Sequence, residues 1–258
     1  MTASAVEPRL AEGSRLHDFR ICVVGLGKIG LALAAQYVSK GWPVFGADID
    51  PDLVQLVARG DAPANSEPGL PERVTAGTAS GLLRATVDTT EAVAASNVVV
   101  VIVPLLADSH GQPDFRALDG ATTAIAGGLQ PGTLVIYETT LPLGTTRNRF
   151  GPLLERSGLR HGQNFLLAFS PERVYVGRTF EDLARYPKVV GGTSPSATRA
   201  AADFYSAVLD AQVMEMPDSE TAEFVKLAET TYRDVNIGLA NDLARFAQGR
   251  GLDAVTAF

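Results

Sequence analysis

Short, almost wholly apolar runs alternate with helical stretches along most of this sequence. A strand that is apolar on both faces is covered on both faces, which is how the strands of a parallel sheet lie between two layers of helices. The alternation therefore predicts an α/β fold built on a doubly wound, mostly parallel sheet. The expected strands are residues 20–24, 43–48, 97–103, 133–138, 164–169, 188–192 and 212–216. The expected helices between them are residues 29–40, 51–59, 89–95, 115–126, 145–156 and 194–209.

A glycine-rich turn, GLGKIG, directly follows the first expected strand and opens the first expected helix. Its glycines allow a tight turn and let the backbone approach a pyrophosphate, which binds at the positive end of the helix. Asp48 ends the next strand, where a carboxylate accepts hydrogen bonds from ribose hydroxyls and repels the extra phosphate of NADP; Asp50 is the competing acid. These features predict a Rossmann domain that holds NAD, and the alternative is a plain glycine turn beside a solvated acid. The expected cofactor contacts here are Gly25, Leu26, Gly27, Lys28, Ile29, Gly30 and Asp48.

Turn residues follow three of the later strands, at the ends where an open parallel sheet binds its ligands. We expect these residues to share one rim with the glycine turn; the alternative for each is an ordinary turn. The expected cofactor contacts on this rim are Val103, Pro104, Leu105, Thr139 and Thr140. The expected substrate contacts are Glu172, Arg173 and Val174.

A long amphipathic helix is predicted from residue 218 to residue 249, because apolar residues recur there every three or four positions. Asp218 or Ser219 is the expected N-cap, and Gly249 ends the helix. Its apolar stripe is larger than one Rossmann domain can cover, and a large exposed apolar patch usually marks a contact surface. We therefore expect a symmetric homodimer that pairs through this helix; the alternative is a monomer whose helix folds back on its own sheet.

One face of this long helix carries Lys226, Thr230 and Arg233, which lie three or four residues apart. A lysine in such a place can stabilise negative charge that develops on a substrate oxygen. The alternative is a solvated charged stripe with an ion pair between Glu229 and Arg233.

Composition excludes several classes of protein. The formal net charge of −7 argues against nucleic acid as a partner, because phosphate contacts need a basic surface. No apolar run reaches the length that spans a membrane, and the start of the chain lacks the apolar core of a signal peptide, so we expect a cytoplasmic protein. The single cysteine, Cys22, lies inside the first expected strand, where a thiol is buried and inert, and no Cys/His cluster suggests a metal.

These observations divide the chain into three parts. Residues 1–18 are expected to be a disordered tail, and residues 19–217 an NAD-binding Rossmann domain. Residues 218–258 are expected to hold a central dimerisation helix and the truncated start of a middle domain.

Several motifs occur in one order between residues 20 and 242: VVGLGKIG, GADID, SEPGL, IVP with HGQPD, ETTLPLGTT, FLLAFSPERV and AEFVKLAETTYRDVNIGLAND. In this order they resemble the UDP-glucose/GDP-mannose dehydrogenase family, and YRDVNI is most similar to the branch that acts on UDP-N-acetylhexosamines. The resemblance implies an oxidoreductase with NAD as cofactor and a UDP-sugar as substrate. Its reaction would be two successive oxidations of the C6 alcohol of UDP-N-acetylmannosamine or UDP-N-acetylglucosamine to the carboxylate, in polysaccharide biosynthesis.

The resemblance also implies roles for single residues. Thr140 resembles the family threonine that helps to place water and cofactor, Glu172 the glutamate that handles water or acts as general base, and Lys226 the lysine that stabilises the oxyanion. Thr230 stands where the family usually has asparagine. The expected catalytic residues are therefore Thr140, Glu172, Lys226 and Thr230. The expected substrate contacts on the helix are Lys226, Arg233 and Asn236, the last two in the stretch typical of the N-acetylhexosamine branch.

Besides Thr230, the sequence departs from the family in three places. Leu105 and Leu106 replace a Thr-Pro pair of many members, and Val176 stands where the loop often has proline. The cysteine nucleophile of the family lies in a Gly-Gly-His-Cys segment after the long helix, which this sequence does not include, and Cys22 is no substitute. We therefore expect the N-terminal part of a longer enzyme, inactive on its own. The alternatives are a two-electron hydroxyacid-type dehydrogenase and a non-catalytic NAD-binding protein that pairs with a partner through its helix.

Overall fold

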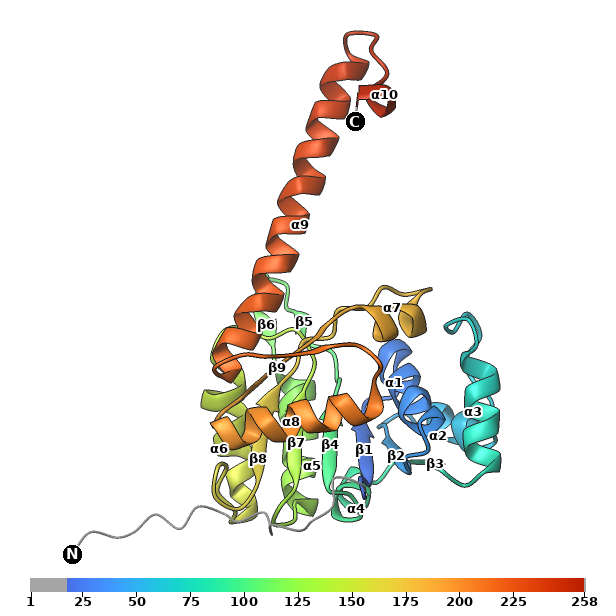
Figure 1. The fold of residues 1–258 in the computed structure, drawn as a ribbon, viewed down its shortest axis with the longest axis vertical. Coiled ribbons are helices and arrows are strands. Elements are labelled where there is room, and N and C mark those ends of the chain that lie inside the picture. Colours follow the sequence, from blue (N-terminus) through green and yellow to red (C-terminus); the bar gives the residue numbers. More distant parts are fainter. Residues whose placement is uncertain (1–17, 258) are drawn as a thin grey trace, which may run out of the picture.

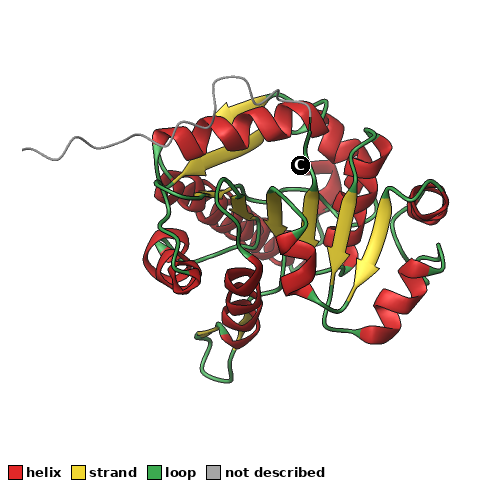
Figure 2. Cartoon of the chain, turned by 90° about the horizontal axis from the view of Figure 1, so that it is seen from below, coloured by secondary structure: helices red, strands yellow, loops and turns green. Residues whose placement is uncertain are grey.

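The computed structural model describes residues 18–257, so the tail expected at 1–18 lies outside the described residues except for Asp18. One sheet runs through the main body, helices cover both of its faces, and a long helix rises away from the body (Figure 1). In the view from below, the strands lie between two helical layers (Figure 2). The expected Rossmann-type α/β fold is confirmed.

The main sheet is built from β1 (Ile21–Val24), β2 (Val44–Ala47), β3 (Leu83–Thr86), β4 (Val98–Val101), β7 (Leu134–Tyr137), β8 (Leu166–Phe169), β9 (Lys188–Gly192) and β10 (Val213–Glu215). Their order in the sheet is β10-β9-β8-β7-β4-β1-β2-β3. The strands from β8 to β3 in this order are all parallel. β9 runs antiparallel to β8, and β10 runs parallel to β9. The sheet is therefore mostly parallel, and most of its carboxyl ends meet at one edge.

The helices are α1 (Lys28–Ser39), α2 (Pro51–Ala58), α3 (Leu70–Ala79), α4 (Thr89–Ala94), α5 (Arg116–Gly128), α6 (Gly151–Leu154), α7 (Thr179–Arg185), α8 (Pro195–Val208), α9 (Ser219–Gln248) and α10 (Ala254–Ala257). Periodicity did not predict α3, α7, β3 or the hairpin of β5 (Leu106–Ala107) and β6 (Pro113–Asp114). β3 lies at the edge of the sheet with Arg84 exposed, so it is no apolar run. α3 contains Gly77 in its interior, which weakens a helical pattern.

One expected helix is interrupted. Residues 145–156 form a π-helical turn (Thr146–Phe150), the short α6 and a 3₁₀ turn (Glu155–Ser157) instead of one α-helix. Pro152 in α6 has no N–H to donate to the preceding turn, so a regular α-helix cannot run through it.

Two apolar cores lie on the two faces of the sheet. In β1, Ile21 and Val23 belong to one core, whereas Cys22 and Val24 belong to the other. Cys22 is fully buried, and burial raises the pKa of its thiol to about 12. The expectation that this thiol is buried is therefore confirmed.

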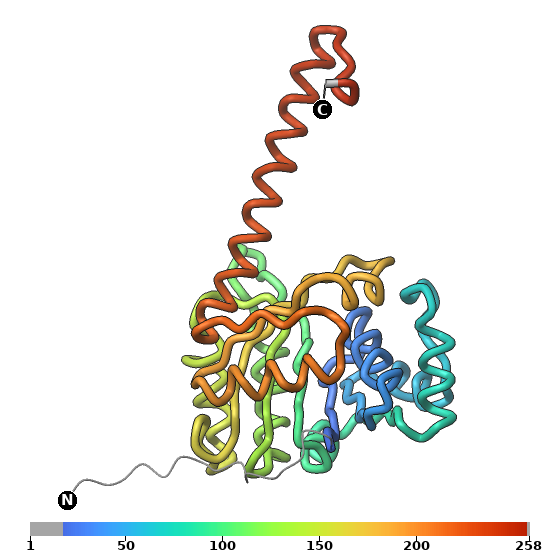
Figure 3. The backbone as a smooth tube through the Cα atoms, viewed as in Figure 1, coloured from blue at the N-terminus to red at the C-terminus, as the bar shows by residue number. Residues whose placement is uncertain are grey.

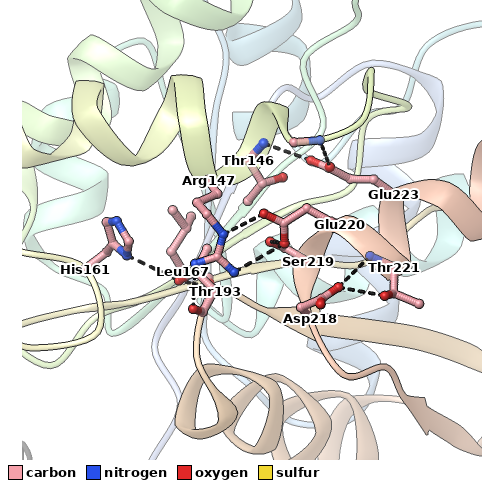
Figure 4. Close-up of polar contacts among 11 residues, drawn as sticks. Thr146, Arg147, His161, Leu167, Thr193, Asp218, Ser219, Glu220, Thr221 and Glu223 are labelled. Carbon is pink, nitrogen blue, oxygen red and sulfur yellow. Dashed lines mark hydrogen bonds and ion pairs between the residues drawn. The ribbon is translucent and has the colours of Figure 1, made fainter.

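The long helix α9 is anchored to the body through its first two turns (Figure 4). Asp218 is its N-cap, as expected, and accepts a hydrogen bond from the amide of Thr221 at 2.7 Å. The fully buried carboxylate of Glu223 accepts hydrogen bonds from the amides of Gly144 and Thr146 at 2.5 and 2.8 Å. Both amides belong to the segment that follows β7, so this segment fixes the direction of the helix.

An ion pair completes this anchor. Arg147 donates to Glu220 on α9 at 2.6 Å and to the carbonyl oxygen of Thr193 at 2.9 Å. Beyond these contacts every residue from 231 to 243 is exposed, and the helix stands clear of the sheet as far as its end at Gly249 (Figure 3). It does not fold back on its own sheet.

Candidate functional site

The glycine turn between β1 and α1 leaves open space where a cofactor would bind. Gly25 has a φ of 97°, a conformation that residues with side chains rarely adopt. A Cβ on Gly30 would stand 1.8 Å from the carbonyl oxygen of Gly25, so only glycine allows α1 to approach the turn this closely. A Cβ on Gly27 would meet no atom within 4 Å, which is the open face expected beneath a pyrophosphate at a helix N-terminus. Of the other turn residues, Leu26 is buried, Ile29 is partly buried and Lys28 is exposed.

The carboxylate of Asp48 lies against this turn. Its Oδ2 accepts a hydrogen bond from the amide of Leu26 at 2.6 Å, and its Oδ1 accepts one from the amide of Asp50 at 3.0 Å. The side chain is partly exposed, and each oxygen keeps a lone pair for a ribose hydroxyl. Asp50 instead caps α2, where its carboxylate accepts from the amide of Asp52 at 3.0 Å. The structure thus brings Asp48, rather than Asp50, to the glycine turn.

The predicted cofactor contacts after β4 and β7 lie next to each other on the sheet edge, because these two strands are paired. The hydroxyl of Thr139 donates to the carbonyl oxygen of Val103 at 2.7 Å. Pro104 and Thr140 are exposed, and Leu105 is partly buried. The residues present therefore fit NAD: an open glycine turn, a helix N-terminus, an acid beside the turn and an exposed rim beyond it.

A pocket of about 230 Å³ opens between α9 and the segment after β8. Three cationic side chains, one carboxylate and three hydroxyls line it, so it suits a polar ligand that carries negative charge. The lining residues are Arg173, Tyr175, Tyr186, Lys226, Glu229, Thr230 and Arg233. Tyr175 and Tyr186 are not among the predicted contacts, because they lie in a stretch without helical or strand periodicity.

Lys226 is held at this pocket through its ammonium group. Its Nζ donates to the backbone carbonyl oxygen of Glu172 at 2.5 Å. Burial lowers the pKa of Lys226 below its ordinary value, and the negative charge of Glu172 opposes this change. The hydroxyl of Thr230 donates to the carbonyl oxygen of Lys226 at 2.8 Å, so this threonine bonds to its own helix. A partly desolvated ammonium in such a position can stabilise an oxyanion.

The remaining charges of the pocket are paired across it. The guanidinium of Arg233 donates to the hydroxyl of Tyr175 at 2.7 Å. Glu229 pairs with Arg173 at 2.6 Å, so the alternative expectation of a Glu229–Arg233 ion pair is wrong for this structure. Both contacts join α9 to the segment after β8.

Three of the predicted substrate contacts, Asn236, Val174 and Glu172, do not line the pocket. The side-chain amide of Asn236 donates to the carbonyl oxygen of Tyr232 at 2.7 Å, one turn earlier on the exposed part of α9. Val174 packs against one of the apolar cores.

The carboxylate of Glu172 lies behind the pocket rather than in its lining. Its Oε1 accepts hydrogen bonds from the amides of Arg173 and Val174 at 2.6 and 3.0 Å, and its Oε2 accepts one from Lys188 at 3.0 Å. Burial raises the pKa of this carboxyl, but the Lys188 ammonium and these hydrogen bonds outweigh burial and hold the pKa below its ordinary value. Glu172 is therefore an ionised, fully bonded group in this structure.

Glu67 fastens the segment after β8 to the other half of the domain. Its carboxylate is 4% exposed and accepts from the amide of Gly177 at 2.8 Å and from that of Thr179 at 3.1 Å, at the N-terminus of α7. Glu67 belongs to the SEPGL motif and is not among the predicted site residues. No local pattern marks its partner, because Gly177 lies 110 residues further along the chain.

Residues 18–257 hold neither a membrane-spanning helix nor a cluster of metal ligands. No helix there has both the length and the apolar character needed to cross a bilayer. The same residues hold no group of three or more His, Cys, Asp or Glu side chains placed to bind a metal ion.

Comparison with known proteins gives one consistent result. Residues 19–209 match the model of the UDP-glucose/GDP-mannose dehydrogenase family, NAD binding domain. The UDP-N-acetyl-D-mannosamine dehydrogenase of Pyrococcus horikoshii is 37% identical over 240 residues, which are 92% of this chain and 56% of that protein. The enzyme of the same name from Salmonella typhimurium is 34% identical over 90% of this chain and 56% of its own length.

A solved structure agrees with these relatives. The UDP-D-ManNAc dehydrogenase of Pyrococcus horikoshii superposes with a TM-score of 0.87 at 37% identity, covering 92% of this chain and 56% of that one. The chain thus spans about half the length of the curated relatives it matches. The motifs, the glycine turn with Asp48 and the family match agree: the chain belongs to the UDP-glucose/GDP-mannose dehydrogenase family, and residues 19–209 form its NAD-binding domain.

Proposed function

We propose that this chain is the NAD-binding part of an enzyme that oxidises the C6 alcohol of a UDP-N-acetylhexosamine, such as UDP-N-acetylmannosamine, to the carboxylate. One observation carries the proposal. The amide of Glu172 donates to the carbonyl oxygen of Glu138 at 3.2 Å, so the cofactor rim after β7 adjoins the segment whose carbonyl holds Lys226. A cofactor on the rim and a sugar in the Lys226 pocket would therefore meet. The activity that the names of the relatives give, on UDP-N-acetyl-D-mannosamine, supports this substrate class.

The residues of this chain would divide the work as follows. NAD, when bound, accepts a hydride from the substrate carbon. Gly27 and the N-terminus of α1 would hold its pyrophosphate, and Asp48 its ribose. Lys226 would donate a hydrogen bond to the substrate oxygen as negative charge develops there. Thr140 on the rim remains the predicted residue for placing water and cofactor, and Thr230 remains a predicted catalytic residue. The carbonyl oxygen of Glu172 would position Lys226.

The proposal extends to the organisation of the chain. Residues 19–217 would form the NAD-binding domain, and residues 218–258 would pair with the same residues of a second copy. Three apolar side chains on α9 support this pairing, since Tyr232, Leu239 and Phe246 are 74%, 55% and 64% exposed. The free, buried thiol of Cys22 suits the reducing cytoplasm.

The first prediction concerns the choice of cofactor. NAD should bind at least about tenfold more tightly than NADP, because the Asp48 carboxylate would face the additional phosphate of NADP. Asp48→Asn keeps the shape but removes the charge, and should reduce the preference to about threefold or less. Calorimetric titration of both cofactors measures this. Asp50→Asn is the matched control, because Asp50 caps α2, and tighter binding of NADP by the parent would contradict the role of Asp48.

The second prediction concerns turnover by the whole gene product. With UDP-N-acetylmannosamine as substrate, Lys226→Ala should lower kcat for NADH formation by about 10²- to 10³-fold, because it removes a donor to the developing oxyanion. The Kd of NAD should stay the same, since Lys226 lies away from the glycine turn. Lys40→Ala is the control, because Lys40 pairs with Asp210 on the surface. An unchanged kcat would refute the role of Lys226.

A further inference from the structure

A buried lysine connects two carboxylates behind the proposed substrate pocket. Lys188, the first residue of β9, donates to Glu138 at 2.7 Å and to Glu172 at 3.0 Å. The side chains of Lys188, Glu138 and Glu172 are 5%, 0% and 11% exposed. Glu138 directly follows β7 and Glu172 follows β8, so the lysine crosses the carboxyl ends of two strands.

Three helices around this cluster, α8, α1 and α9, each bring a polar or charged group to it. From α8, Tyr205 donates to Glu138 at 2.5 Å. From α1, Tyr37 brings a buried hydroxyl that has no hydrogen-bond partner among the described residues, and its pKa is raised first by burial and then by the charges of Glu138 and Glu172. From α9, Lys226 bonds to the carbonyl oxygen of Glu172. At the centre of this cluster, the carboxylates of Glu138 and Glu172 share the buried ammonium group of Lys188.

Such a cluster is a poor device for stability alone. Removing an ion pair from water costs several kcal/mol per ion, and well-packed apolar residues often stabilise a protein as well or better. What the cluster provides is a fixed position for Glu172. The carboxylate of Glu172 accepts hydrogen bonds from the amides of Arg173 and Val174, and its backbone carbonyl oxygen accepts one from Lys226. The position of the Glu172 side chain therefore determines the conformation of the pocket wall.

We propose that Lys188 is a positioning residue for the pocket: its ammonium keeps the Glu172 carboxylate ionised and bonded to the backbone of its own segment, and so fixes the carbonyl that holds Lys226. The importance of this positioning for catalysis rests on the proposed function.

The charges of the cluster support this assignment. Burial raises the pKa of Glu138 to about 7, although Lys188 opposes this rise, whereas Lys188 and the hydrogen bonds hold the pKa of Glu172 low. Between the two carboxyls, Glu138 is therefore the one that takes up a proton near neutral pH, and Glu172 stays ionised. Without the ammonium, burial is the largest influence left on Glu172, and it favours the protonated form. A protonated carboxyl is a weaker acceptor for the amides of Arg173 and Val174.

The test follows the backbone amides that report the charge of Glu172. Proton and nitrogen shifts of Arg173 and Val174 are recorded by NMR on the deuterated 258-residue chain between about pH 5 and about pH 8. Glu138→Gln is compared with Lys188→Met combined with Glu138→Gln. The double variant avoids leaving two carboxyls together without a cation, so we expect it to fold. The amide of Tyr175 is the internal control, because it donates to Asp182 at 2.9 Å instead.

In Glu138→Gln, which removes the titration of Glu138 itself, the amides of Arg173 and Val174 should not titrate in this range. In the double variant both should titrate together, with Tyr175 unaffected. Flat profiles in the double variant, titration already in Glu138→Gln, or an equal response of Tyr175 would overturn the proposal. No sample contains NAD or sugar, so a failure of cofactor binding would refute the proposed function and leave this result standing.

Discussion

Gly30→Ala should destabilise the chain by about 3 kcal/mol or more and abolish measurable NAD binding. A Cβ at this position would stand 1.8 Å from the carbonyl oxygen of Gly25 and 2.8 Å from the side chain of Ile102. The first of these atoms belongs to the turn itself, so relief requires α1 to move away from β1. That movement would carry the helix N-terminus away from the pyrophosphate. Urea unfolding measures the stability, and calorimetry measures the binding of NAD.

A second glycine of the same turn provides the matched comparison. Gly27→Ala should leave the stability within about 1 kcal/mol of the parent, because the new methyl group would meet no atom within 4 Å. It should still weaken NAD binding by about tenfold or more, since the methyl group would occupy space beneath the pyrophosphate. Gly120→Ala, in α5, is the control that should change neither property for the worse. NAD binding by Gly27→Ala at the affinity of the parent would place the cofactor elsewhere.

Leu239→Asp combined with Leu243→Asp should convert the proposed dimer into a monomer. The two leucines are 55% and 42% exposed and lie one turn apart on α9. An isologous interface would bury each aspartate in both copies without a partner, at several kcal/mol per charge, so the dimer should weaken by more than about a hundredfold. Light scattering at micromolar concentration measures the mass.

The opposite face of the helix supplies the control. Asn241→Asp adds the same charge about half a turn away from the two leucines and should leave the dimer intact. A parent chain that is already monomeric, or a dimer that survives the paired aspartates, would count against pairing through α9.

The sequence predicts two kinds of element well: strands that are buried on both faces, and helices that carry one clear apolar face. β1 and β4 are uninterrupted apolar runs, and α9 begins and ends at residues with recognisable capping roles. β3 was not predicted, because it is an edge strand that is less buried and includes the charged residue Arg84. The reversed direction of β9 depends on the path of the chain through α7, a helix of seven residues whose pattern is too short to recognise.

The sequence also predicts one part of the site better than the other. The glycine turn follows β1 and Asp48 follows β2, and these two strands are paired, so their contact is predicted from the order of the strands. Lys188 begins a short strand and carries no signal of its own, because its partner Glu138 lies 50 residues away. The Glu172 side chain points towards that lysine. The position of its carboxylate behind the pocket therefore could not be predicted from the residues next to it in the sequence.

The way in which α9 is fastened makes it a lever. From Asp234 to Gln248 its free part is about 20 Å long at 1.5 Å per residue, so a tilt of about 5° at its base would displace its tip by about 2 Å. The base is set by Glu223, which receives two hydrogen bonds from the segment that directly follows Thr139 and Thr140. A small displacement of this segment as the cofactor rim fills would therefore be magnified several-fold at the far end of the helix. Directional bonds to a buried carboxylate resist such a tilt far better than apolar contacts, which allow neighbouring surfaces to slide.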